Sequence, residues 1–428
     1  MEWIGIAIKW LSVILVAVPS LISGFRIFRI PGFSRFFSGD SNVKLTEASP
    51  FNINNTESQY CFMQITALTL LNRAVIFLIA YLGFLSMKGH SVDFFASFSE
   101  IWARWDARDY LKIAEHWYQG SGEDRFLIVY YPLYPFAIRL VHYIIGNYFW
   151  AAIAVSLSAL IAATYFFYRL IMIELADSGV ARDAVRYMLI FPVSFFYSTA
   201  YTESLFLLLT VLTFYYCRRN CWFAASIAGM LAAMTRNQGV LLLAPLSIEL
   251  FCRHQHAKMT VDKLVKHGAC LLLVPLGLCV YLSINKWVTG DWFKFLEYQR
   301  VHWYGQFGFF ADNLKNIFQN ISGSDMKLTV GTWIPELAYF FVSLYFIIST
   351  VRKIPPAYIV YSVISLVISY SPTWLIAGPR YIGAIFPLYI CMALFVRGHY
   401  IRQQLLDTTS YLLLGFYTIQ YFINSNVF

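Results

Sequence analysis

Residues 149–171 read FWAAIAVSLSALIAATYFFYRLI, a stretch in which Arg169 is the only charged residue. A bilayer core of about 30 Å is crossed by about 20 apolar residues in a helix, so this stretch predicts a membrane span. Apolar runs recur along the 428 residues, near 4–24, 64–86, 131–146, 185–217, 222–252, 264–284, 333–351, 356–376, 380–396 and 409–425. We therefore predict an all-α polytopic membrane protein with roughly 10–12 membrane helices.

The composition supports this class. Hydrophobic residues make up 59% of the chain, charged residues only 13%, and the mean hydropathy is +0.59. A soluble domain carries about 25% charged residues, so much of this surface is expected to face lipid. The net charge of +9 is interpreted as basic cytoplasmic loops rather than nucleic-acid binding. The seven cysteines form no CxxC pair, which favours small buried apolar residues over a metal site or disulfides.

Two of the apolar runs, 185–217 and 222–252, have lengths that fit neither one span nor two. As a single helix, the first would extend about 50 Å at about 1.5 Å per residue. Each run is interrupted by polar residues, Tyr201-Thr202-Glu203 in the first and Thr235-Arg236-Asn237-Gln238-Gly239 in the second. We predict that each run is a pair of short helices bent back at its polar stretch, which is allowed where backbone lines a cavity.

Basic residues orient the chain. By the positive-inside rule, the cytoplasmic side receives five clusters, Arg169/Arg182/Arg186, Arg218/Arg219, Arg253/Lys258/Lys263/Lys266, Arg352/Lys353 and Arg397/Arg402. Glu203, Arg236 and Arg380 then fall toward the opposite face, together with the polar loops 87–130 and 285–332. This topology requires 131–146 to enter the membrane without crossing it, and the two prolines of Tyr131-Pro132-Leu133-Tyr134-Pro135 favour such a dip.

The first 67 residues are treated as a separate region. Residues 4–24 are predicted to form an uncleaved helix, because Glu2 stands where a signal peptide has basic residues. Residues 25–62 form a polar loop of unassigned side with a glycosylation sequon at Asn54, and a second sequon occurs at Asn320. The remaining residues, 68–428, are predicted to form one domain.

The loop 87–130 contains the densest group of chemically useful side chains, WARWDARDYLKIA at 102–114. Its aromatic residues recur at helical spacing, which predicts one amphipathic helix in the membrane interface. Asp106 and Asp109 would lie side by side on it. Either both acids pair with Arg104, Arg108 or Lys112 and solvate the polar face, or Asp106 accepts the proton of an acceptor hydroxyl as a general base.

Three charged residues in apolar surroundings are further candidates. An acid within a membrane segment is costly unless it faces a cavity or a partner, which makes Glu203 a functional candidate or a turn contact. Arg236 and Arg380 are suited to a phosphate, although one of them is also a candidate counter-ion of Glu203. His302 and Trp303, together with Asp291, Glu297 and Arg300 of the second outer loop, belong either to an acceptor groove or to a solvated helix. No metal-ligand spacing, Walker loop, GxGxxG turn or DxD motif occurs, so neither a metal, a cofactor nor a nucleotide sugar is expected.

These motifs together resemble the PIG-V family. The resemblance rests on Trp105-Asp106-Ala107, Tyr110-Leu111-Lys112-Ile113-Ala114, residues 131–135, Ala200–Phe206, Thr235–Gly239, Pro379-Arg380-Tyr381 and Phe386-Pro387-Leu388, which follow the family's order. It covers the chain from about residue 68 to the C-terminus. Asp109 and Gln238 depart from the eukaryotic pattern, and residues 289–310 are closer to prokaryotic relatives. This favours a prokaryotic plasma membrane over the endoplasmic reticulum.

The resemblance implies a GT-C fold, a helical bundle with its active site in the first outer loop. It also implies an inverting mannosyltransferase that uses a polyprenyl- or dolichyl-phosphate mannose donor and a lipid-linked or GPI-like glycan acceptor. Asp106 would be the catalytic base. The residues assigned to the donor phosphate or the substrate are Arg236, Arg380, Glu203, Asp109, Asn237 and Trp105. An accessory subunit is left open.

The competing hypothesis is a multi-pass transporter or lipid flippase, because broken helices with buried charges also form transport sites. Transporters usually place their broken segments in corresponding halves of the chain, whereas 185–217 and 222–252 are adjacent here. A tryptophan-rich outer loop also suits chemistry at a membrane surface, so the sequence favours the enzyme.

Overall fold

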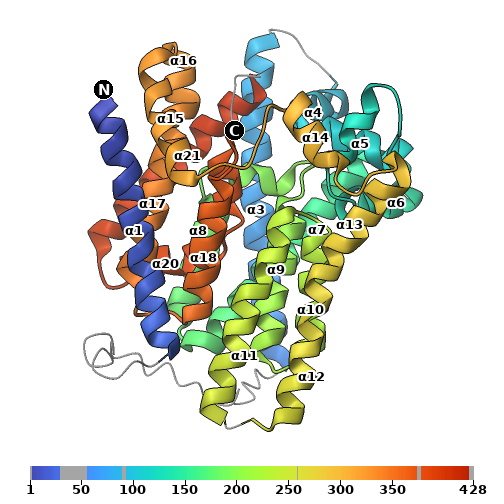
Figure 1. Ribbon diagram of the computed structural model, residues 1–428. Helices are drawn as coiled ribbons and strands as arrows, with labels where there is room; N and C mark the ends of the chain where they lie inside the picture. The colour runs from blue at the N-terminus through green and yellow to red at the C-terminus, as the bar shows by residue number, and fades with distance from the viewer. Residues whose placement is uncertain (1, 29–54, 89–92, 258, 374–376, 424–428) are drawn as a thin grey trace.

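The computed structural model describes residues 2–28, 55–88, 93–257, 259–373 and 377–423 (Figure 1). These residues form helices and loops without a strand; Phe307 and Pro372 make an isolated β-bridge. Five helices in this part of the chain are long and apolar enough to cross a membrane: Glu2–Phe28 (α1), Cys61–Met87 within α3 (Asn55–Lys88), Tyr148–Leu175 (α7), Val261–Thr289 (α12 and α13) and Met326–Thr350 (α16, η4 and α17). The prediction of an all-α protein with membrane-spanning helices is thus confirmed at this level.

The apolar run 185–217 is broken as predicted. Helix α8 (Ser178–Ile190) ends before Pro192, which disfavours the helical conformation of the residue preceding it. The short η2 (Ser194–Ser198) follows, and α9 (Glu203–Arg218) begins at the acid itself. The fully buried Arg73 of α3 stabilises the turn, because its guanidinium donates to the carbonyl oxygens of Leu189 at 2.6 Å and Ser194 at 2.5 Å.

The run 222–252 is broken at its polar stretch as well. Helix α10 (Trp222–Ala233) is followed by η3 (Asn237–Leu242) and α11 (Leu243–Ala257). Gly239 packs so tightly on the end of α10 that a Cβ there would lie 2.2 Å from the backbone nitrogen of Ala233. Gly277 of α13 (Leu273–Thr289) approaches α10 just as closely, at 2.2 Å from the carbonyl oxygen of Met230. Small residues allow these helices to pack backbone to backbone.

The prediction of one amphipathic helix across 102–117 is wrong. The chain forms two helices, α4 (Phe94–Trp102) and α5 (Asp106–His116), and residues 103–105 turn between them. Trp102, Ile113 and Ala114 are completely buried, so this face packs in the protein core instead of the membrane interface. After α5, η1 (Glu123–Val129) and α6 (Leu133–Ile145) meet at an angle of 111°. The entry of 131–146 into the membrane without crossing it stays a prediction.

The rest of the bundle surrounds these hairpins. Helix α14 packs on η1 and α13, and Figure 1 shows α1 alongside α15. Lys9 and Asp312 form an ion pair of 2.5 Å between α1 and α15. The sequon at Asn54 and the basic residue Lys258 lie outside the described residues. The remaining helices are α14 (Lys294–His302), α15 (Phe310–Gly323), α16 (Met326–Leu328), η4 (Thr329–Trp333, a π-helix), α17 (Ile334–Thr350), α18 (Pro356–Ser369), α19 (Gly378–Gly383), α20 (Pro387–Val396), α21 (Tyr400–Phe422) and α12 (Val261–Leu271).

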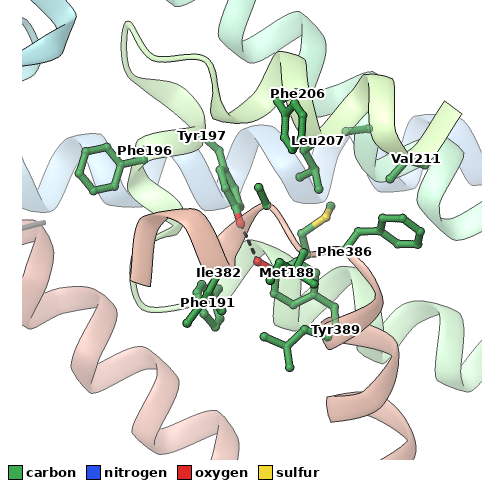
Figure 2. Close-up of a cluster of buried hydrophobic side chains, with 14 of the residues drawn as sticks. Met188, Phe191, Phe196, Tyr197, Phe206, Leu207, Val211, Ile382, Phe386 and Tyr389 are labelled. Carbon is green, nitrogen blue, oxygen red and sulfur yellow. Dashed lines mark hydrogen bonds between the residues drawn. The ribbon is translucent and has the colours of Figure 1, made fainter. Parts of the chain in front are cut away.

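The core is rich in aromatic rings. Figure 2 shows α19 and α20 packed on residues 188–211 through buried side chains that include Phe206, Ile382 and Phe386. At its centre the hydroxyl groups of Tyr197 and Tyr389 lie 2.6 Å apart, and both donate to the carbonyl oxygen of Gly383. This packing fixes the segment that carries Arg380 against α9.

The two ends of α9 have different surroundings. Over its 16 residues α9 extends about 24 Å, with Glu203 in the first turn and Arg218 in the last. Arg218 pairs with Glu174 and Glu249, and the nearby Arg397 contacts Asp177 in the same part of the bundle. We call this the basic end. The opposite end, where Glu203 lies, is called the cleft end.

Candidate functional site

A cleft of about 1370 Å³ opens at the cleft end. Its lining comes from the start of α5, the residues between η1 and α6, η3 and α19, and also from α14 and the loop after it, η4 and the end of α18. Its lining includes five residues that the sequence analysis selected for the site: Trp105, Asp106, Arg236, Asn237 and Arg380.

Asp106 is the first residue of α5, and its carboxylate faces the cleft. The side chain is 29% exposed. Its Oδ1 accepts a hydrogen bond of 3.1 Å from the hydroxyl of Tyr130, and its Oδ2 lies 3.0 Å from Nη2 of Arg380. The predicted alternative, in which the acids of α5 pair with Arg104, Arg108 or Lys112, is not observed, since Lys112 pairs with Asp124 at 3.3 Å.

The backbone directly before Asp106 is strained. Trp105 has φ +46° and ψ −126°, a conformation that a bulky residue rarely adopts. Surrounding contacts hold it there: its ring packs edge-on against Tyr421 at 5.1 Å, and the hydroxyl of Tyr201 donates to the carbonyl oxygen of Arg104. Strain of this kind persists where the surrounding structure over-determines it, and it is common at functional sites. Here it turns the chain so that α5 begins at the cleft.

Glu203 joins both arginines. Its Oε1 lies 3.0 Å from Nη1 of Arg236 and 3.1 Å from Nε of Arg380, although the latter contact is not aligned for a hydrogen bond. The question of which arginine is the counter-ion of Glu203 is therefore answered: both are. Glu203 is 1% exposed and does not line the cleft, so its contacts are with protein groups. We call Asp106, Glu203, Arg236 and Arg380 the cleft cluster.

The two arginines keep donors for a further anion. Within the described part of the chain, Nη2 and Nε of Arg236 and Nη1 of Arg380 make no hydrogen bond. Both side chains line the cleft, and the ring of Tyr381 lies 5.0 Å from one guanidinium and 5.4 Å from the other. Two guanidinium groups with spare donors in one cleft suit a phosphate, which binds arginine through charge-assisted hydrogen bonds.

Asp109 lies behind the wall of the cleft. Its Oδ2 accepts a hydrogen bond of 2.9 Å from Tyr130, the same hydroxyl that contacts Asp106. Burial raises the pKa of the Asp109 carboxyl above its ordinary value. Because it does not line the cleft, Asp109 supports Tyr130 and Asp106 and has no direct access to a substrate there.

Four of the five residues that the sequence placed in either a groove or a solvated helix line the cleft, and Asp291 does not. The four are Glu297, Arg300, His302 and Trp303. The His302 ring stacks on Phe126 at 4.4 Å, which ties α14 to η1. The groove hypothesis therefore fits the geometry for these four residues.

Sequence reasoning did not identify three residues that hold the site and its surroundings in place: the partly exposed Tyr130 and the buried Arg73 and Glu336. Arg73 and Glu336 are charged residues inside the apolar runs 64–86 and 333–351. The rule that selected Glu203, that an ionisable residue in a membrane segment is costly and usually functional, would also have selected these two. Tyr130 gives no comparable signal, because a tyrosine is common in such a chain.

Across the residues that the structure describes, no group of three or more His, Cys, Asp or Glu side chains is placed to hold a metal ion. The comparisons with known proteins add no identity, since no protein-family model and no curated protein matches the chain.

Proposed function

We propose that this protein is a membrane glycosyltransferase that takes its sugar from a lipid-phosphate donor, with Asp106 as the catalytic base. The proposed donor is polyprenyl- or dolichyl-phosphate mannose, and the acceptor is a lipid-linked glycan. The proposed fold class is GT-C, on the resemblance to the PIG-V family, and the proposed location is a prokaryotic plasma membrane. No cofactor is part of the proposal.

The observation that carries the proposal is the cleft itself, which is lined by the carboxylate of Asp106 and by two arginines with spare donors. A lipid-phosphate sugar needs one base at its acceptor, because the phosphate leaves without a proton. Of the three carboxylates on α5, those of Asp106, Asp109 and Glu115, only that of Asp106 lines the cleft. Glu297 also lines the cleft, but its carboxylate is 48% exposed and pairs with Lys294 at 2.6 Å, whereas Asp106 contacts Arg380. A single base suits such a transfer, whereas a glycosidase would use a pair of carboxylates.

The proposed step is an inverting displacement. The acceptor oxygen attacks the anomeric carbon while its proton passes to Asp106, and the bond from that carbon to the phosphate oxygen breaks with its electron pair leaving on phosphate. Arg236 and Arg380 stabilise the charge on the departing phosphate. A donor phosphate competes with Asp106 for the guanidinium of Arg380, which frees carboxylate lone pairs for the acceptor hydroxyl.

Sugar transfer by purified protein in detergent tests the proposal. Radiolabelled polyprenyl-phosphate mannose is supplied with a lipid extract as acceptor, and Asp106→Asn is compared with wild type. Asp124→Asn is the matched control, because Asp124 is an exposed carboxylate that does not line the cleft. We expect label in a new lipid with wild type and with the control, and no label with Asp106→Asn.

Two outcomes contradict the proposal. Full turnover by a correctly folded Asp106→Asn protein removes Asp106 as the base. No transfer from mannose, glucose or arabinose donors by wild type removes the glycosyltransferase and shifts support to the transport hypothesis.

A further inference from the structure

Glu336 is a completely buried acid on α17, inside the apolar span Met326–Thr350. Among the described residues it forms no ion pair with Lys, Arg or His, which separates it from Glu203. A carboxyl group placed in a membrane segment without a cation is costly, and it is retained where it has a specific partner. Its partner lies at the start of α19.

The carboxyl group of Glu336 caps the short helix that carries Arg380. Its Oε1 accepts a hydrogen bond of 2.9 Å from the backbone N–H of Gly378, the first residue of α19. The first N–H groups of a helix have no partner within the helix, and an acidic oxygen there is favourable. The Tyr370 hydroxyl donates to the backbone carbonyl oxygen of Glu336 at 2.7 Å, which holds α17 at this contact.

The contact requires glycine at position 378. A Cβ on Gly378 would lie 2.1 Å from Oε2 of Glu336 and 2.7 Å from the hydroxyl of Tyr370. Any side chain there would push α19 away from Glu336. The pairing of Gly378 with Glu336 thus fixes where the helix begins, two residues before Arg380.

The other end of α19 is fixed as well. The carbonyl oxygen of Gly383 accepts hydrogen bonds from Tyr197 at 2.7 Å and Tyr389 at 2.6 Å, within the cluster drawn in Figure 2. With both ends held, the position of Arg380 between Asp106 and Glu203 follows from the placement of its helix. Only the Glu336 end depends on a buried acid.

We infer that Glu336 is a positioning residue: through the N–H of Gly378 it sets the place of Arg380, and thereby the affinity of the cleft for a phosphate. The inference rests on the proposed function, in which Arg380 binds the donor phosphate. Glu336 does not line the cleft and touches no substrate.

The test compares two substitutions that break the contact between Glu336 and Gly378 with one substitution that keeps it. Glu336→Leu removes the acceptor oxygen, and Gly378→Ala places a methyl group against it. Glu336→Gln retains an oxygen that accepts from Gly378 N–H. Gly415→Ala is the matched control for Gly378→Ala, because a Cβ at Gly415 on α21 meets no atom within 4 Å.

Binding of undecaprenyl monophosphate and the donor KM in the transfer assay are measured for each folded variant. We expect Glu336→Leu and Gly378→Ala to weaken binding and raise KM about tenfold, since the hydrogen bond that holds the start of α19 is lost. Glu336→Gln and Gly415→Ala are expected within about twofold of wild type. A purely structural role would reduce the folded yield and leave the KM of the folded protein unchanged, and that result overturns the inference.

A second measurement needs no ligand and separates this inference from the proposed function. Arg380→Met is introduced into wild type and into Glu336→Leu, and the Tm of each protein is recorded. Because neighbouring residues in one network are coupled, we expect Arg380→Met to lower Tm less in the Glu336→Leu background. An equal loss in both backgrounds overturns the inference. If the two substitutions are coupled in Tm but wild type does not bind undecaprenyl monophosphate, the positioning contact is supported and the proposed function is contradicted.

Discussion

Helix α9 carries a buried charged cluster at each end, and the two clusters have the same composition. The cleft cluster consists of Asp106, Glu203, Arg236 and Arg380. The basic-end cluster consists of Glu174, Arg218, Glu249 and Arg253, in which Arg218 contacts both acids and Arg253 lies 2.8 Å from Glu249. Each cluster thus contains two carboxylates and two guanidinium groups. The acid at the start of α9 and the arginine at its end both suit the helix dipole.

The two clusters differ in whether their charged groups have access to the cleft. Glu174, Arg218 and Glu249 are each at most 7% exposed. None of the basic-end cluster lines the cleft. At the other end of α9, Asp106 is 29% exposed, and both arginines line the cleft with donors to spare.

Buried charge in a helical membrane protein therefore does not by itself mark a site. At both ends of α9, ion pairs offset the free-energy cost of burying charge. A search for a functional site by buried charged residues alone would therefore select either cluster. The cleft and the spare arginine donors distinguish the end suited to chemistry. If this distinction is correct, changes at the basic end should affect stability, and changes at the cleft end should affect transfer.

The largest effect is expected from Arg218→Met. It leaves Glu174 buried with only the hydroxyl of Tyr358, at 2.6 Å, among its described partners. Removing one partner of a buried ion pair costs about 3–5 kcal/mol, and we expect a loss of that size in the free energy of unfolding in detergent. The donor KM of the remaining folded protein should stay within about twofold of wild type.

Arg219→Met is the control for Arg218→Met, because Arg219 is the exposed neighbour at the end of α9. Its unfolding free energy should change by less than about 0.5 kcal/mol. A folded Arg218→Met protein with a strongly raised donor KM would mean that the two clusters are coupled, and the proposed division between them would be wrong.

The next effect is expected at the cleft end, from Arg236→Lys. Lysine keeps a positive charge for Glu203 but loses the Nη2 and Nε donors, which make no hydrogen bond among the described residues. Loss of one donor to a developing charge typically costs about 100-fold in rate, so we expect kcat/KM for the lipid-phosphate sugar to fall by about that factor. Arg253→Lys at the basic end is the matched control and should transfer at the wild-type rate. Equal kcat/KM values for Arg236→Lys and Arg253→Lys would contradict the proposed difference between the two ends of α9.

Several parts of the fold could be predicted from the sequence because local rules decide them. Pro192 ends α8, and the polar residues at 201–203 and 235–239 coincide with the breaks in the two long apolar runs. The cleft-cluster residues were also identified individually, since each is an ionisable residue in apolar or interfacial surroundings.

Their partners could not be predicted. Arg380 contacts Asp106 across 274 positions of the chain, and no spacing rule relates residues so far apart. The prediction of one helix across 102–117 was wrong because helical spacing does not reveal the strained turn at Trp105. That turn depends on a contact with Tyr421, near the other end of the chain. Burial of Asp109 behind the cleft wall likewise depends on Tyr130, which follows η1.

The smallest effect tests whether Asp109 lies behind the cleft, separated from the solvent inside it. Burial raises the pKa of Asp109, so the folded protein binds this proton more tightly than the unfolded chain. The stabilisation from this carboxyl is present below its ordinary pKa of about 4 and is lost as pH rises through its raised value. Asp109→Asn does not titrate and keeps an oxygen that accepts from Tyr130. The Tm of Asp109→Asn minus the Tm of wild type should therefore increase, by at most a few degrees, as pH rises above about 4 toward 7.

Thermal unfolding in detergent at pH values across this interval measures the difference directly. Asp124→Asn serves as the comparison, because that carboxylate is 41% exposed and its substitution removes an acid from the surface of the same region. A constant gap between Asp109→Asn and wild type would show that Asp109 is as solvated as a surface acid. The carboxylate would then belong to the cleft together with Asp106, and α5 would present two candidate bases there in place of one.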